Sequence, residues 1–71
     1  MTTLLSNEEK AGIINQHLKN LQYNKFNLEI SVVEENAKAT PETAALANFN
    51  AQITDFNSRI TALEAELDKL V

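Results

Sequence analysis

The sequence predicts an all-α protein, specifically an antiparallel two-helix hairpin of the coiled-coil type. Three observations lead to this fold class. The 71 residues include one glycine and one proline, so little of the chain is suited to loops. Apolar residues recur at alternating spacings of three and four in both halves, which is the heptad pattern of paired helices. The single proline, Pro41, lies between the two halves and predicts a break there.

The first helix is predicted to begin after Ser6. Ser6 and Glu9 have the spacing of a capping box, in which each side chain bonds the backbone N–H of the other residue. We expect this helix to cover residues 7–37. The apolar stripe that would form its side of the hairpin seam is interrupted by one lysine and comprises Ile14, Leu18, Leu21, Lys25, Leu28 and Val32.

The second helix is predicted from Thr40 and Pro41. Thr40 is expected as its N-cap and Pro41 as its first residue, where the missing N–H of proline costs no helical hydrogen bond. The turn would then cover residues 38–40 and the second helix residues 41–71. Its stripe continues without interruption through Leu46, Phe49, Ile53, Phe56, Ile60, Leu63, Leu67 and Leu70.

The two stripes also predict how the helices align. If the chain folds back between Thr40 and Pro41, every residue of the first stripe meets an apolar residue equally far from the turn. The predicted pairs are Val32 with Phe49, Leu28 with Ile53, Lys25 with Phe56, Leu21 with Ile60, Leu18 with Leu63 and Ile14 with Leu67. Because the stripes and the proline indicate the same turn independently, we expect residues 1–71 to form one hairpin domain.

One segment allows a different interpretation. Residues 26–33 alternate apolar and polar side chains and are rich in β-branched residues, which is a strand pattern. A single strand would need a partner strand from another chain, and no turn residue separates this segment from the residues before it. The helical interpretation is therefore preferred.

A second apolar stripe explains that alternation. Residues spaced by three and four also lie on the side of the first helix opposite its seam, and we call this surface the second face. It comprises Tyr23, Phe26, Ile30, Val33 and Ala37. A helix that is apolar on two sides is normally buried on both. We therefore predict an interface here, formed by self-association into a larger helical bundle or, alternatively, by docking onto a different protein.

Chain length and composition favour the same conclusion. A two-helix hairpin buries only one stripe of each helix, and small domains usually need an additional stabilising element. The chain has no cysteine for a disulfide and one histidine for a metal site, so oligomerisation or docking remains. A net charge of −4 argues against nucleic acid as a partner. No long apolar run predicts a membrane span, and the first residues do not resemble a signal peptide.

The polar residues do not suggest catalysis. His17 has no acid or cysteine at a relay spacing, and Glu34 and Glu35 are expected to be solvated helix residues, as are Glu64, Glu66 and Asp68. Lys25 is expected to pack its stem in the seam with its amine in water, or alternatively to fix the pairing of the helices. We therefore predict no enzyme activity, no cofactor and no metal.

Four segments resemble small uncharacterised proteins encoded by tailed phages of marine cyanobacteria. These segments are Leu5-Ser-Asn-Glu-Glu-Lys, Ile14-Asn-Gln-His-Leu-Lys, Leu28-Glu-Ile-Ser-Val-Val-Glu-Glu-Asn36-Ala and Leu63-Glu-Ala-Glu-Leu67. The resemblance implies a virion component or an accessory protein, located in the particle or in the host cytoplasm. The expected function is that of a structural, oligomerising phage protein or assembly component. The alternative is a small regulatory protein that modulates a host protein through the second face.

Overall fold

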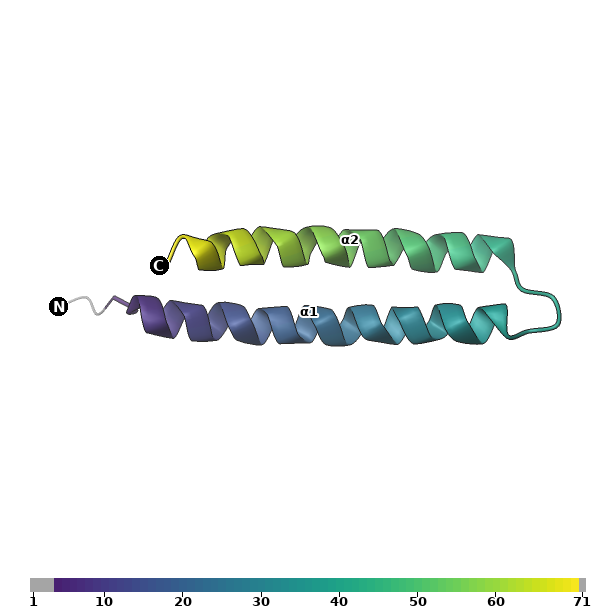
Figure 1. Cartoon of the computed structure of the whole chain (residues 1–71), viewed down its shortest axis with the longest axis horizontal. Coiled ribbons are helices and arrows are strands. Elements are labelled where there is room, and N and C mark those ends of the chain that lie inside the picture. Colours follow the sequence, from purple (N-terminus) through teal and green to yellow (C-terminus); the bar gives the residue numbers. More distant parts are fainter. Residues whose placement is uncertain (1–3, 71) are drawn as a thin grey trace.

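The computed structural model describes residues 4–70 and shows two long helices lying side by side and antiparallel (Figure 1). Helix α1 spans Asn7–Asn36 and helix α2 spans Thr43–Asp68. The molecule is a rod, with principal extents of 62 × 20 × 14 Å. The predicted fold class, an all-α antiparallel hairpin, is confirmed.

The N-terminus of α1 is capped as predicted. Ser6 is the N-cap residue, and its hydroxyl accepts a hydrogen bond of 3.1 Å from the Glu9 N–H. The Glu9 carboxylate accepts a second bond, also of 3.1 Å, from the Ser6 N–H. The bond from the Ser6 N–H lowers the pKa of Glu9, and the nearby Ser6 hydroxyl lowers it further. The reciprocal bonds satisfy two N–H groups that the helix itself leaves without acceptors.

The second helix begins later than predicted. Its N-cap is Glu42, and α2 starts at Thr43, so the assignment of Thr40 as N-cap and Pro41 as first helical residue was wrong. Helix α1 ends at Asn36, and the connection therefore covers residues 37–42 instead of 38–40. The chain has to cross about 8–10 Å between the two helix axes before α2 can begin. The turn and bends lie at residues 37–40, and the chain is extended at Glu42, with φ −89° and ψ 113°.

The C-terminal end also differs from the prediction. Helix α2 ends at Asp68, with Lys69 as its C-cap, although the sequence predicted a helix to residue 71. The last backbone N–H groups, of Lys69 and Leu70, bond carbonyls three residues earlier, so the final turn tightens as helix ends commonly do. Val71 and residues 1–3 lie outside the described residues.

The strand interpretation of residues 26–33 was wrong, because this segment lies wholly within α1. Its apolar residues belong to two different sides of one helix. Leu28 and Val32 are half-buried, whereas Phe26, Ile30 and Val33 are exposed. Two helical stripes offset by two residues produce the same local alternation as a strand.

Candidate interaction surfaces

The hairpin seam forms the interior of the molecule. All the predicted seam residues are buried or half-buried: Ile14, Leu18, Leu21, Lys25, Leu28, Val32, Leu46, Phe49, Ile53, Phe56, Ile60, Leu63, Leu67 and Leu70. Among the described residues, Leu18 and Ile60 are the most buried apolar side chains, at 8% and 9% exposed. The interior is thus one layer of side chains shared between two helices, which is thin for a domain that folds alone.

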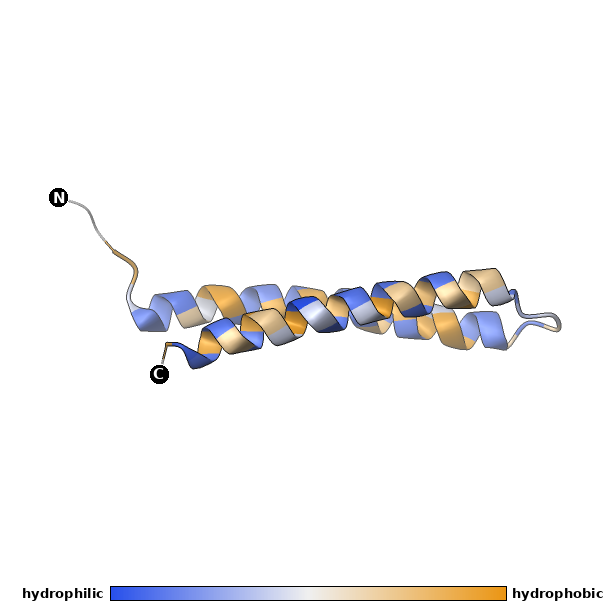
Figure 2. Ribbon diagram, turned by 90° about the horizontal axis from the view of Figure 1, so that it is seen from above, coloured by the Kyte–Doolittle hydropathy of each residue, from blue (hydrophilic) through white to orange (hydrophobic). Residues whose placement is uncertain are grey.

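The second face is exposed to solvent. Tyr23 is 71% exposed, Phe26 61%, Ile30 42% and Val33 63%, and Ala37, the C-cap residue of α1, is exposed as well. Figure 2 shows apolar and polar residues alternating along both helices, which is how one helix carries two apolar sides. Within residues 4–70, no part of the hairpin covers these side chains. The structure therefore brings the five predicted residues together on one open surface.

A smaller apolar area lies at the end of the hairpin remote from the turn. Ile13, which is 48% exposed, lines a shallow hollow there with Leu5, Ile14, Leu63 and Leu70. The two helix ends are also joined by a hydrogen bond of 3.3 Å from the Asn7 side-chain amide to the Leu70 carbonyl. This area could not be predicted from the two apolar stripes, because Ile13 and Leu5 belong to neither.

Glu35 is buried, which the sequence analysis did not predict. Its side chain was expected to be solvated together with Glu34, but Glu35 is only 7% exposed, whereas Glu34 is exposed. The available signal was its spacing, because Glu35 follows Val32 by three residues and so occupies the next position of the seam. At that position a carboxylate lies between the helices where the heptad pattern would place an apolar residue.

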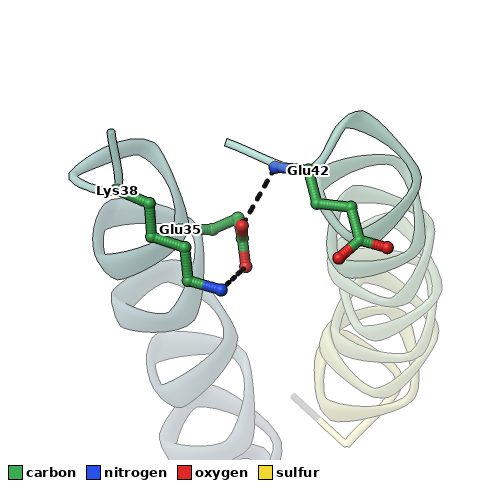
Figure 3. A network of polar contacts seen from close by, with 3 residues as sticks. All are labelled: Glu35, Lys38 and Glu42. Atoms are coloured by element: carbon green, nitrogen blue, oxygen red, sulfur yellow. Dashed lines mark hydrogen bonds and ion pairs between the residues drawn. The ribbon is translucent and has the colours of Figure 1, made fainter. Parts of the chain in front are cut away.

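The Glu35 carboxylate joins the two sides of the turn (Figure 3). One oxygen accepts a hydrogen bond of 3.0 Å from the backbone N–H of Glu42, the N-cap residue of α2. The other oxygen lies 3.0 Å from the Lys38 ammonium group, with which it forms an ion pair. Both partners lower the pKa of Glu35 below its ordinary value of 4.5, and the Glu42 N–H has a larger effect than Lys38. Each oxygen of the carboxylate therefore has a partner, and the group has a structural role in closing the turn.

Acid is expected to weaken the hairpin through this group. Because the pKa of Glu35 is lower in the fold than in the unfolded chain, its bonds stabilise the fold above pH 4.5, and this contribution is lost as the pH falls through the folded-state pKa. Glu35→Gln removes the titrating charge, so urea unfolding followed by circular dichroism should depend less on pH below 4.5. Glu34→Gln, a change at the exposed neighbour, should retain the wild-type dependence. Equal acid sensitivity in the two variants would contradict this role of Glu35.

The other polar residues lie apart from one another or in solvent. His17, Glu64, Glu66 and Asp68 are exposed. Within residues 4–70, no three His, Cys, Asp or Glu side chains are grouped so that they could hold a metal ion. Over the same residues, neither helix contains an apolar stretch long enough to span a membrane. Comparison with protein-family models, curated proteins and solved structures found no match to this chain.

Proposed function

We propose that this protein is a non-enzymatic structural protein whose hairpins self-associate through the second face into a larger helical assembly. The observation that carries the proposal is the exposure of Tyr23, Phe26, Ile30 and Val33 on one side of α1. Four large apolar side chains within three helical turns form a patch of a few hundred Å², the size that usually marks an interaction site.

The thin seam favours self-association over a stable monomer. A domain of this size buries a small fraction of its surface, and such domains are commonly stabilised by disulfides, metals or oligomerisation. The chain has no cysteine, and among its described residues no metal-binding group is present. Covering the second face with another copy would add the apolar burial that the isolated hairpin lacks.

The biological setting that we propose follows from the resemblance to small proteins of tailed phages. A small acidic hairpin that assembles with itself suits a component of the phage particle or a factor that acts during its assembly in the host cytoplasm. The net charge of −4 fits protein partners better than nucleic acid. A regulatory protein that binds a host protein through the same face is the competing function, and the oligomeric state separates the two.

The test places two charges on the second face. The double variant Phe26→Asp with Ile30→Asp is expected to reduce the mass in solution, measured by light scattering after size exclusion, from that of an oligomer to that of a monomer. Burying two carboxylates in an apolar contact is far more costly than leaving them in water. Circular dichroism at high protein concentration would show whether the variant hairpin remains helical.

The matched control is His17→Asp with Asn24→Asp. Both residues are exposed, both lie on α1, and neither belongs to the second face, so the control adds the same negative charge elsewhere. It should retain the wild-type mass. A wild-type protein that is monomeric over a wide range of concentration would overturn the proposal and favour the regulatory function.

A further inference from the structure

Helix α2 has an outward side that is the counterpart of the second face of α1. From Ala44 to Ala65, the residues spaced by three and four on the side of α2 opposite its seam are all small and all exposed, and we call them the small-residue stripe; the next position is Asp68. The stripe comprises Ala44, Ala47, Ala51, Thr54, Ser58, Thr61 and Ala65. The two helices of one chain thus carry different outward sides, one with large apolar side chains and one with small side chains.

Two of the three polar members of this stripe can be covered without losing hydrogen bonds. The Thr54 hydroxyl donates a bond of 3.1 Å to the Asn50 carbonyl, and the Ser58 hydroxyl donates one of 3.2 Å to the Thr54 carbonyl. Their donors are therefore satisfied within α2 itself. A buried hydroxyl that keeps its bond carries little of the penalty that an unpaired one would impose.

The large and small side chains lie at matching heights along the rod. Val32 and Ile53 line one surface hollow between the helices, and Ile14 and Leu63 line another, so in each case the α2 residue lies about one helical turn from the partner that the predicted pairing gives. Suppose a second hairpin lies beside the first in the same orientation, so that its α2 packs against the outward side of α1. In that arrangement each residue of the second face meets a small one, in the pairs Tyr23 with Ser58, Phe26 with Thr54, Ile30 with Ala51, Val33 with Ala47 and Ala37 with Ala44.

Large side chains opposite small ones allow two helices to approach and interdigitate. The match does not depend on one exact alignment. A slide of half a helical turn, about 2.7 Å, leaves the large residues opposite small ones because the stripe is small from Ala44 to Ala65. Two copies of the second face would instead place Tyr23, Phe26 and Ile30 against side chains of similar bulk.

The charges along the edges of this contact also favour a second copy in the same orientation. Along the middle of the contact three carboxylates flank the two outward sides, and each falls opposite an amide rather than another carboxylate. The expected neighbours are Glu29 with Asn50, Glu34 with Asn48 and Asp55 with Asn27. An amide can donate a hydrogen bond to a carboxylate, whereas two facing carboxylates would repel each other.

From these matches we propose that the occupant of the second face is the small-residue stripe of another copy, so that hairpins associate side by side in one orientation. The inference rests on the proposed self-association and adds its geometry. A contact between two different surfaces of the same protein is heterologous, and it generates either a closed ring or an open row of subunits. Each hairpin in such an assembly uses α1 toward one neighbour and α2 toward the other.

The first test asks whether α2 takes part. Ala51→Arg puts a large charged side chain in the small-residue stripe and should reduce the mass in solution to that of a monomer, as the double change on the second face does. The control is Gln52→Arg, an equal substitution at the next residue, which is exposed but lies about 100° away around the helix. It should retain the wild-type mass.

The second test identifies the contact by disulfide trapping, which a chain without cysteine permits. After oxidation, the double variant Ile30→Cys with Ala51→Cys should give a ladder of covalent dimers, trimers and larger species on a denaturing gel. The two positions lie on opposite outward sides of one hairpin, about 20 Å apart by helix diameters, so no bond can form within a chain. Neither single-cysteine variant should crosslink alone, and a mixture of the two should stop at dimers.

The outcomes distinguish the two proposals. If Ile30→Cys alone forms dimers, or if Ala51→Arg leaves the oligomer intact, the second face meets itself or another surface and the side-by-side geometry is wrong, while self-association stands. If the wild-type protein is a monomer and no variant crosslinks, both proposals fail. Tyr23→Cys with Ser58→Cys repeats the trapping test without changing Ile30.

Discussion

Ile60→Ala is expected to lower the free energy of unfolding by about 2–3 kcal/mol, toward the low end of the range for a buried isoleucine. Ile60 is the most buried side chain of α2, at 9% exposed, and it belongs to a seam only one layer thick. A domain of this length has in total about 4–10 kcal/mol of stability, so the loss removes a large part of it. The melting temperature should fall by about 10–20 °C.

The measurement is thermal and urea unfolding followed by circular dichroism, at one protein concentration for all variants because self-association would shift the midpoints. Ile13→Ala is the control, since it makes the same chemical change at a residue that is 48% exposed. It should cost less than about 1 kcal/mol. Similar losses for the two variants would show that the seam is not the main source of stability.

Lys25→Leu is expected to raise the stability by about 1 kcal/mol, the value of burying roughly half of a leucine side chain. Lys25 is half-buried in the seam, at the height of Phe56 in the predicted pairing. Its ammonium group forms no ion pair with any other residue in the range 4–70, so the substitution breaks none there. Thermal unfolding of the variant would measure the gain.

Lys25→Gln separates the two explanations for this lysine. If the lysine stem packs while the amine stays in water, the neutral glutamine changes stability little and only leucine raises it. The oligomer mass then stays the same in both variants. If the charge instead fixes the pairing of helices, the leucine variant should change the oligomer mass or populate more than one species. A leucine variant less stable than the wild type would contradict both explanations.

The fold could be predicted because its determinants are periodic. The seam positions follow from spacings of three and four alone, and all those predicted on α1 and α2 are less exposed than most of their neighbours. The capping box at Ser6 and Glu9 could also be predicted, because its two bonds connect residues three apart and need no knowledge of the rest of the chain. Tertiary packing does not override these local patterns in this protein.

The turn could not be predicted in the same way. The threonine-proline signal is local. The start of α2 depends instead on the distance that the chain crosses between the helices and on the hydrogen bond that the Glu42 N–H donates to the Glu35 carboxylate. Glu35 itself was missed because a glutamate is ordinarily solvated. Its burial makes sense only once the donors that it meets, from Lys38 and from the other side of the turn, are known.

The carboxylate of Glu35 also bears on whether two chains exchange helices. The seam offers the same side-chain contacts whether α1 and α2 belong to one chain or to two, so an open form in which two chains swap helices retains them. What distinguishes the closed hairpin is the connection, and there the bond from the Glu42 N–H to Glu35 holds the chain in its turned-back form. A single buried glutamate thus favours the closed topology over the domain-swapped one.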